Sequence, residues 1–469
     1  MKLVIINGSP KGEKSVTLQY IQFLKKKFGH IDFRIFHVGK MYKTLEMNSE
    51  NMNALEEALK NADGIIWTFG VYIDLVPYQL KRFIEHIMNT ECKSLFTNKQ
   101  VITVSTSARW LDMIAHNYMQ AICDDLNMKY VGFYSAETED LIKENEQERL
   151  EYFFRDFENA IVTDRPYEKR YASIETSDFV YSNDKPIIKK EIVNKRVTII
   201  TDHNPNESKD QSLMNMVEHI KFLYDNTCKV VNLNDLDIKN GCIACFKCAY
   251  ENKCVFEALD NYNETLNSDI LTADILVFAG RLSERYYSSR WKMYFDRNFV
   301  YGHIPIYRNK QILVVTSGKL SQNQPFRDSI EMGQDWHRSN LVGFISDESE
   351  DNNLIASLIE THVDRSIIMS ENSYVKTPTF ASIGISKLIR DELFRYQRSI
   401  MKADNRFYKS NRLYDFPKMQ VGHSILGVFY NFKWFRKYIH SQSRLDDIFI
   451  DPHKKIVNSI CNEKGAKNE

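Results

Sequence analysis

An internal repeat constrains the fold of this chain more than any other feature of its sequence. Four pairs of segments are separated by the same 211 residues: 62–69 and 273–280, 80–87 and 291–298, 99–107 and 310–318, and 129–135 and 340–346. Within these pairs, ADGIIWTF matches ADILVFAG, and KQVITVSTS matches KQILVVTSG. One offset shared by four segments predicts two copies of a single fold.

The second copy contains an insertion. Its first candidate strand, RVTII (196–200), follows KLVII (2–6) by only 194 residues, so 17 residues are gained between the first and third strands. Residues 241–257, GCIACFKCAYENKCVFE, have that length, lack a counterpart in the first copy and contain four of the eight cysteines. We therefore interpret this cysteine-bearing stretch as the insertion.

Each copy alternates strand-like and helix-like segments. In the first copy LVIINGS, GIIWTF and VITVSTS are short β-rich runs, whereas LQYIQFLKKKF and NALEEALKNA have helical periodicity. This alternation predicts an α/β fold in which helices cover both faces of a parallel sheet. We predict domains at 1–162 and 195–350, a linker at 163–194 and a mainly helical C-terminal segment at 351–469.

Three stretches of the C-terminal segment have distinct patterns. An apolar stripe predicts a helix from Ser386 to about Lys402. The polar and aromatic run at 402–417 is a candidate lid over a site. Residues 423–440 interleave aromatic with cationic side chains, and we favour docking of this stretch on its own domain over binding to a membrane surface.

Charge and composition exclude several classes of protein. The 62 Lys and Arg residues balance 62 Asp and Glu residues, which argues against a nucleic-acid binder. The apolar runs fall far below the roughly 20 residues of a membrane span, and the N-terminal stretch lacks the features of a signal peptide. Eight cysteines in 469 residues are too few for a disulfide scaffold, so we predict a cytoplasmic protein with one local cysteine site.

The loop after the first strand has the composition of an anion site. Strand LVIIN runs through GSPKGEKSVT into a helix, and unpaired backbone N–H groups converge at such a helix start. Ser9, Ser15 and Thr17 add hydroxyl donors, and Lys11 or Lys14 adds positive charge. The spacing departs from that of a nucleoside triphosphate loop. We predict phosphate binding here; the alternative is an ordinary capped helix start.

This loop and a later segment resemble a known family. The first strand ends in Gly-Ser-Pro and leads to Ser-x-Thr, and ADGIIWTFGVYIDLVPYQLKRFIEHI contains a strand and loop of the same family's kind. Residues 1–135 and, more weakly, 195–346 resemble the NAD(P)H-dependent FMN reductases. The resemblance implies two tandem flavodoxin-like, doubly wound parallel sheets with the strand order 2-1-3-4-5. Where the family has Pro-x-Tyr, this chain has Gly70-Val71-Tyr72.

The resemblance also implies an FMN site in the first copy. The residues carried over are Ser9, Lys11, Ser15, Val16 and Thr17 around the phosphate, Phe69, Gly70, Val71 and Tyr72 beside the isoalloxazine, and Ser105, Thr106, Ser107 and Ala108 in a third loop. NAD(P)H is the implied electron donor. No catalytic side chain is predicted, because the flavin ring itself performs the hydride chemistry.

The second copy lacks the features of this flavin site. Gly8 aligns with His203, which removes close backbone approach to a phosphate. Ser15 aligns with Asp210, and a carboxylate repels a phosphate. We therefore predict no FMN in the second copy.

The second copy instead has Cys242, Cys245, Cys248 and Cys254, which we predict to be metal ligands. Four thiolates at such close spacing can surround one soft metal centre. Residues 238–260 resemble the compact cysteine motif of iron–sulfur flavoproteins, which are relatives of the same reductases, and this resemblance implies a [4Fe–4S] cluster. A structural zinc ion and unmetallated thiols are the alternatives.

These features together predict an NAD(P)H-dependent FMN oxidoreductase. In this hypothesis FMN in the first copy accepts hydride, and single electrons leave through a cluster in the second copy to a small-molecule or protein acceptor. The alternatives are an electron-transfer flavoprotein without nicotinamide turnover and a non-catalytic scaffold or binding protein. The sequence is consistent with a fused pair that stands alone or that forms a homodimer.

Overall fold

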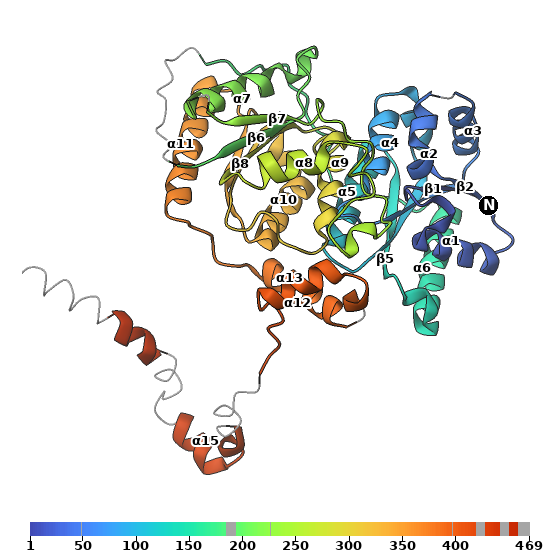
Figure 1. Cartoon of the computed structure of the whole chain (residues 1–469). Helices are drawn as coiled ribbons and strands as arrows, with labels where there is room; N and C mark the ends of the chain where they lie inside the picture. The colour runs from blue at the N-terminus through green and yellow to red at the C-terminus, as the bar shows by residue number, and fades with distance from the viewer. Residues whose placement is uncertain are drawn as a thin grey trace, which may run out of the picture. The chain divides into compact units, whose positions relative to one another are not determined.

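The computed structural model describes most of the chain, in two compact units of residues 1–411 and 412–469. The described residues are 1–47, 49–183, 194–225, 227–395, 397–418, 427–440 and 450–457. The first unit contains two α/β domains and several C-terminal helices (Figure 1). The second unit contains α15 (Lys433–His440). No helix among the described residues is long and apolar enough to cross a membrane.

The first domain is built on a five-stranded parallel sheet. Its strands are β1 (Lys2–Asn7), β2 (Asp32–Phe36), β3 (Gly64–Gly70), β4 (Gln100–Ser107) and β5 (Lys129–Glu137). Their order is β2-β1-β3-β4-β5. Its helices are α1 (Val16–Lys27), α2 (Val38–Met47), α3 (Ser49–Lys60), α4 (Tyr78–Met88), α5 (Asp112–Asp125) and α6 (Glu144–Val162). The predicted flavodoxin-like strand order is thereby confirmed for this domain.

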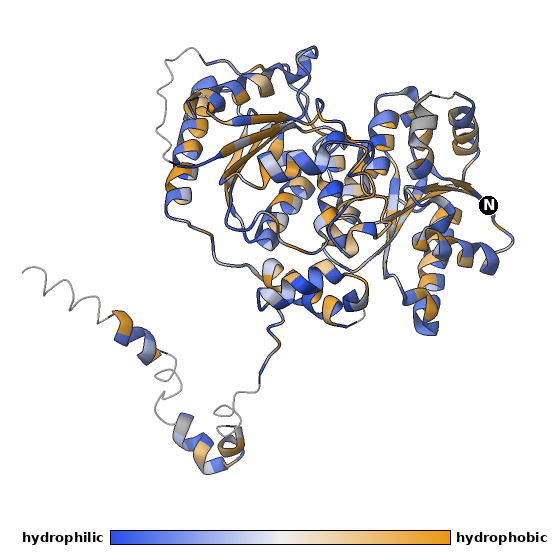
Figure 2. Ribbon diagram, viewed as in Figure 1, coloured by the Kyte–Doolittle hydropathy of each residue, from blue (hydrophilic) through white to orange (hydrophobic). Residues whose placement is uncertain are grey.

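The side chains of the buried strands point alternately to the two faces of the sheet, which explains why helices cover both faces. In β1, Leu3 and Ile5 belong to a core that also contains side chains of α1 and α6. Val4 and Ile6 belong to a second core with side chains of α3, α4 and α5. Successive strand residues point to opposite faces, so an uninterrupted apolar strand needs a helical layer on each side. Figure 2 shows these hydrophobic strands inside helices whose outer faces are polar.

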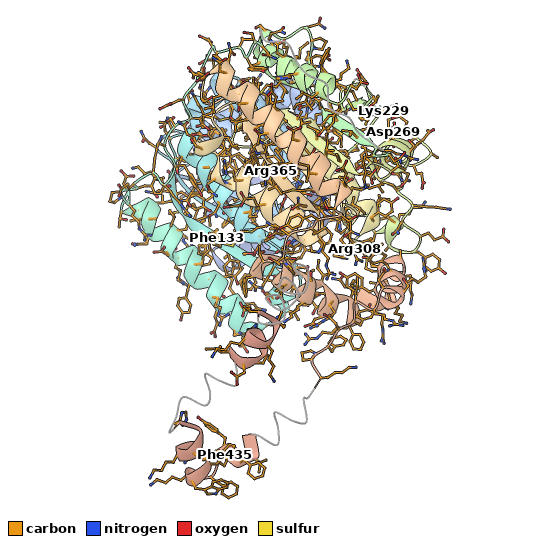
Figure 3. All side chains as sticks on the ribbon, turned by 90° about the vertical axis from the view of Figure 1, so that its left-hand side faces the viewer. Phe133, Lys229, Asp269, Arg308, Arg365 and Phe435 are labelled. Atoms are coloured by element: carbon orange, nitrogen blue, oxygen red, sulfur yellow. The ribbon has the colours of Figure 1, made fainter. Side chains whose placement is uncertain are left out.

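The second domain repeats this architecture. Its strands are β6 (Val197–Thr201), β7 (Lys229–Asn232), β8 (Ile275–Arg281), β9 (Gln311–Ser317) and β10 (Asn340–Ser346), in the order β10-β9-β8-β6-β7. Its main helices are α7 (Gln211–Leu223), α9 (Ser289–Arg297), α10 (Gln324–His337) and α11 (Asn352–Glu371). At its edge, Lys229 Nζ lies 3.4 Å from Asp269 Oδ2 (Figure 3). Because α11 packs into the core of this sheet, the second domain extends beyond the predicted boundary at residue 350.

The cysteine-bearing stretch lies between β7 and β8, where the first domain has α2 and α3. It contains only a short 3-10 helix (Lys247–Ala249) and is followed by α8 (Tyr262–Thr265) and a single π-helical turn (Leu266–Ile270). Ala244 and Phe246 adopt left-handed backbone conformations with φ of 49° and 58°. This position agrees with the predicted insertion between the first and third strands of the second copy.

The two domains contact each other through equivalent residues. The Lys81 Nζ of α4 donates to the Ser283 carbonyl at 2.8 Å. The Lys292 Nζ of α9 donates to the Tyr72 carbonyl at 2.6 Å. Both the two lysines and the two carbonyls are 211 positions apart. Reciprocal contacts of this kind are those of two like subunits around a two-fold axis.

Two carboxylates at the same interface, also 211 positions apart, make equivalent contacts to the opposite domain. The backbone N–H of Tyr78 donates to Asp296 Oδ2 at 2.8 Å, and that of Ser289 donates to Glu85 Oε1 at 2.5 Å. Each carboxylate therefore receives a free N–H at the start of the other domain's helix, α4 or α9. The apolar core between the sheets contains side chains from both domains, so residues 1–411 form one packed body.

The C-terminal helices differ in one respect from the prediction. The helix predicted from Ser386 to about Lys402 is wrong in its bounds, because α12 runs from Phe380 to Phe394. A 3-10 turn (Gln397–Ser399) and α13 (Lys402–Ser410) follow. Arg395 has ψ of −102°, which takes the backbone out of the helix. The apolar stripe continues across this break and does not reveal it. The predicted mainly helical character of the segment is confirmed.

A candidate cofactor pocket between the two domains

A cavity of about 300 Å³ lies at the carboxyl ends of β1, β3 and β4. Ligands of open α/β sheets bind at this edge. Eleven of the thirteen predicted flavin residues line it: Ser9, Lys11, Ser15, Val16, Thr17, Gly70, Val71, Tyr72, Thr106, Ser107 and Ala108. Three loops that are far apart in the sequence thus meet around one space.

The other two predicted residues, Phe69 and Ser105, are not among those that line the cavity, and their part in flavin binding stays a prediction. Both are fully buried beneath it. The Ser105 hydroxyl lies 2.8 Å from His116 Nε2, and the Phe69 ring centroid lies 5.6 Å from that of His116. Successive strand residues point to opposite faces of the sheet, and the paired residues Phe69 and Ser105 lie on the face covered by α5, which a loop-based resemblance does not resolve.

Asn7, which sequence reasoning missed, organises the phosphate-type loop. Its buried side-chain oxygen accepts hydrogen bonds from the Ser9 N–H at 3.1 Å and the Thr68 hydroxyl at 3.3 Å. Its amide nitrogen donates to the Gly12 carbonyl at 3.1 Å. Ser15 precedes α1, but its side chain makes no capping hydrogen bond. The alternative of a helix start capped by Ser15 is therefore not observed, and its hydroxyl stays available to the cavity.

Thr17 joins the phosphate-type loop to the other two loops. Its hydroxyl donates to the Phe69 carbonyl at 3.2 Å and lies 2.6 Å from the Thr106 hydroxyl. Both threonines are buried at the base of the cavity. The ends of α1, β3 and β4 are consequently held together by side-chain hydrogen bonds.

The loop after β3 is a tight hairpin. Ile73 and Asp74 have φ of 43° and 59°, and Tyr72 bridges to Leu75, as in a two-residue turn with two left-handed positions. A Cβ at Gly70 would lie 3.1 Å from Tyr72 Cε1, so glycine lets the tyrosine ring approach the backbone. Burial raises the pKa of Asp74 to about 7, although nearby Lys292 and a hydrogen bond from Ser329 oppose this shift.

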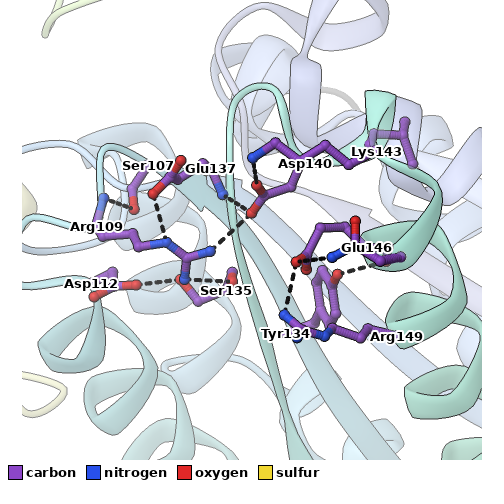
Figure 4. A network of polar contacts seen from close by, with 12 residues as sticks. Ser107, Arg109, Asp112, Tyr134, Ser135, Glu137, Asp140, Lys143, Glu146 and Arg149 are labelled. Atoms are coloured by element: carbon purple, nitrogen blue, oxygen red, sulfur yellow. Dashed lines mark hydrogen bonds and ion pairs between the residues drawn. The ribbon is translucent and has the colours of Figure 1, made fainter. Parts of the chain in front are cut away.

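The third loop is held by a polar network around Arg109 (Figure 4). Arg109 has φ of 58° and its N–H donates to Ser107 Oγ at 2.8 Å. Its guanidinium donates to Glu137 and Asp140, both at 2.9 Å. Burial alone would raise the pKa of Asp140, but hydrogen bonds from Lys143 and the Glu137 N–H and the nearby positive charges lower it overall. An ionised Asp140 thus fixes the loop that lines the cavity.

The second domain and a C-terminal turn supply the remaining wall of the cavity. The lining residues that sequence reasoning missed are Ala244, Phe246, Asp296, Phe299, His303 and Gln397, together with Ile73, Asp74, Trp110 and Thr138 of the first domain. Lys11 Nζ lies 5.4 Å from the centre of the Phe246 ring, so the phosphate-type loop and the cysteine-bearing stretch touch. Asp74 and Trp110 lie two positions after the predicted residues Tyr72 and Ala108, and this closeness in sequence is a signal that could have revealed them.

The four predicted metal ligands surround a second, smaller cavity. Cys242, Cys245, Cys248 and Cys254 all line it. Burial raises the pKa of Cys242 to about 12 and that of Cys248 to about 11, so these thiols are neutral unless a metal displaces their protons. Within the described ranges, no group of three or more His, Cys, Asp or Glu side chains is arranged to hold a metal ion. Metal binding by these cysteines therefore stays a prediction.

The chemistry of the small cavity suits a thiolate-ligated cluster. Arg297 lines it and pairs with Asp260 at 2.6 Å. The Arg297 Nε–H is buried and has no hydrogen-bond partner among the described residues. A buried N–H donor is costly without an acceptor, and sulfur atoms of an anionic cluster would provide one. The donor set of four thiols fits the same group.

Carboxylates fill the corresponding place in the second domain. Asp347 Oδ2 accepts hydrogen bonds from the hydroxyls of Ser212 and Ser317 at 2.6 and 2.7 Å. Asp210 Oδ2 accepts a hydrogen bond from the Asn204 N–H at 2.8 Å. Donors that could face a phosphate are already satisfied by these internal anions. The absence of FMN from this domain stays a prediction, which this arrangement supports.

The other described cysteines, Cys92, Cys123 and Cys228, line neither of the two cavities. Cys92 and Cys123 are buried free thiols, and Cys228 is a half-buried one. Cys461 lies outside the described residues, as do part of the aromatic stretch at 423–440 and part of the linker at 163–194.

Comparison with known proteins identifies the kind of domain that carries the larger cavity. Residues 1–139 match the family model of NADPH-dependent FMN reductases. The match confirms the predicted resemblance for the first domain and the prediction of a flavin-dependent oxidoreductase. No curated protein matches the chain.

Solved structures similar to this chain include an apo NADH:FMN oxidoreductase (EMOB), with 17% identity, 34% of this chain and 89% of that chain covered, and a TM-score of 0.30. The NAD(P)H:acceptor oxidoreductase FerB from Paracoccus denitrificans has 15% identity, covers 34% of this chain and 97% of its own, and has a TM-score of 0.28. The FMN complex of general stress protein 14 from Treponema denticola has 11% identity, coverages of 34% and 98%, and a TM-score of 0.26.

Proposed function

We propose that the protein is an NAD(P)H-dependent FMN oxidoreductase that passes electrons through a [4Fe–4S] cluster to a small-molecule or protein acceptor. The observation that carries this proposal is the shared wall between the two cavities. Cys242, Ala244, Phe246, Asp296 and Phe299 line both of them. A flavin and a cluster bound in these places would be neighbours within a single chain.

The larger cavity offers FMN a suitable set of groups. Lys11 provides charge for the phosphate, and Ser15 provides a hydroxyl at the start of α1. Tyr72 and Val71 provide an apolar surface for a planar ring. The volume of about 300 Å³ lies within the range of small-molecule pockets. Bound FMN would supply hydride acceptance and the change from two-electron to one-electron transfer.

Cys242, Cys245, Cys248 and Cys254 would hold the cluster, and the Arg297 Nε–H would donate to its sulfur atoms. The reciprocal lysine contacts at the interface support gene duplication as the origin of the pair. In this proposal the first domain keeps the flavin and the second holds the metal centre. Each half of the duplicated chain has thus specialised, and the protein acts in the cytoplasm.

The Cys245→Ala variant tests the electron route, with Cys228→Ala as the matched control because Cys228 lines neither cavity. Cys245→Ala should lose reduction of a one-electron dye yet keep anaerobic bleaching of its flavin by NAD(P)H. Equal loss or equal survival of both activities contradicts the relay. Flavin that dithionite bleaches and NAD(P)H does not would favour the electron carrier without nicotinamide turnover.

A further inference from the structure

The C-terminal helices place a carboxylate against a histidine of the cofactor cavity. His303 follows α9 and lines the larger cavity. Its Nδ1 lies 2.8 Å from Asp404 Oδ2, and its backbone N–H donates to the same oxygen at 3.0 Å. Asp404 is on α13, 101 positions further along the chain, and is only 1% exposed. A buried carboxylate is thus dedicated to one histidine.

The surrounding residues keep this pair in place. Gly302 has φ of 55°, and a Cβ there would lie 2.4 Å from Asp404 Oδ2, so only glycine permits this approach. The Tyr408 hydroxyl of α13 donates to the His303 carbonyl at 3.3 Å. Arg406, also on α13, donates to the Tyr250 carbonyl of the cysteine-bearing stretch at 2.5 Å. Helix α13 therefore forms hydrogen bonds to both segments that face the cavity, the cysteine-bearing stretch and the segment that contains His303.

The hydrogen bond to Asp404 decides which ring nitrogen serves the cavity. A carboxylate only accepts, so His303 presents Nδ1–H to Asp404. The other nitrogen, Nε2, is then the one available to molecules in the cavity. When the ring carries both protons, Nδ1–H donates to Asp404 and the proton on Nε2 can pass to a molecule in the cavity.

We propose that His303 is the proton donor of the cofactor cavity and that Asp404 positions it. This inference rests on the proposed FMN function. NAD(P)H gives one hydride, that is two electrons and one proton, to FMN. Formation of neutral FMNH2 needs one further proton, which His303 supplies from Nε2 and then regains from water. The balance is NAD(P)H + H⁺ + FMN → NAD(P)⁺ + FMNH2.

The proposal gives the predicted lid region a specific role. The sequence predicts a candidate lid at residues 402–417 and assigns no chemistry to it. In the structure, α13 at the start of this region supplies Asp404, and the preceding turn supplies Gln397 to the cavity wall. Within the described residues, the C-terminal helices are thus part of the site.

The test compares His303→Gln and Asp404→Asn with His30→Gln. His30 is a matched control because its Nε2 pairs with Glu158 at 3.2 Å on the surface and it does not line the cavity. FMN dissociation constants and thermal unfolding midpoints are measured first on flavin-free protein. Stopped-flow bleaching of the FMN-loaded protein by NAD(P)H then gives the rate of flavin reduction, and His303→Ala is assayed with and without added imidazole.

His303→Gln should bind FMN within about threefold of wild type and reduce it at least about 100-fold more slowly. Asp404→Asn should also be slower, His30→Gln unchanged, and imidazole should restore part of the rate of His303→Ala. Wild-type reduction rates in both His303→Gln and Asp404→Asn would overturn the proposal. If His303→Gln fails to fold, Asp404→Asn alone decides it. Wild-type protein that binds no FMN would instead refute the proposed function.

Discussion

Lys11 and Lys14 stand three positions apart in the phosphate-type loop, yet only Lys11 lines the cavity. Lys11→Ala should therefore weaken FMN binding about tenfold, because a charge-assisted contact contributes roughly 1.5–3 kcal/mol and part of it is screened at the rim. Lys14→Ala, an equal change of net charge, should leave the dissociation constant nearly unchanged. Fluorescence titration of flavin-free protein measures both. Equal weakening in the two variants would show that the loop acts only through its overall charge.

His116 is buried under the third loop, with Nδ1 2.8 Å from the Thr103 hydroxyl. Burial lowers its pKa from 6.5 to about 3. Between pH 6.5 and 3, His116 binds a proton in the unfolded chain but stays neutral in the folded protein. The free energy of unfolding should therefore fall as pH decreases from 6.5 toward 3, by up to about 1.4 kcal/mol per pH unit from this residue.

Urea denaturation between pH 7 and 5 checks this expectation. His116→Gln should reduce the change in the free energy of unfolding with pH by the contribution of one titrating group. His30→Gln, at an exposed position, should leave this pH dependence unchanged. An unchanged slope in His116→Gln would mean that another group causes the acid sensitivity. His337 is half-buried, and desolvation lowers its pKa to about 3 as well, so part of the slope will persist.

At the scale of elements, helices α4 and α9 hold the two domains together through buried charges. Lys292 and Asp296 form an ion pair in which both side chains are 0% exposed. Lys292→Met should destabilise the protein by about 3–5 kcal/mol, because it leaves Asp296 buried without its partner. Lys292→Met/Asp296→Asn should recover much of this loss, since the amide still accepts from the Tyr78 N–H.

The control for this pair is Lys221→Met, which removes a surface contact with Glu218. Exposed ion pairs contribute about 0–1 kcal/mol, so this variant should unfold at nearly the wild-type urea concentration. A Lys292→Met protein as stable as Lys221→Met would show that the interface tolerates an unpaired carboxylate.

Strands were predictable from the sequence because each is a short β-rich run between loop residues, as GIIWTF and KQILVVTSG illustrate. The break after Phe394 was not, because the apolar stripe runs on through Ile389, Leu393 and Ile400. Periodicity reports which face is apolar and carries no information about a change in backbone direction. The extent of the second domain was missed for a similar reason, since α11 begins where the repeat of sequence has ended.

At the scale of the whole molecule, the repeat predicted two like domains but not the site that they form together. Tyr72 and Lys292 are 220 positions apart in the sequence, and Lys11 and Phe246 are 235 positions apart (246 − 11). Their proximity depends on how the sheets dock, which no local pattern encodes. The residues of the first domain's loops were found by resemblance, whereas His303, Asp404 and Gln397 required the docked structure.

We expect one chain to bind one FMN, in the cavity between its two domains. Titration of flavin-free protein with FMN, followed by flavin fluorescence and by absorbance on the same sample, tests this claim most directly. We expect saturation at one FMN per chain in the wild type, and the same stoichiometry with weaker binding in Lys11→Ala. Saturation at two FMN per chain, or no binding at all, would contradict it.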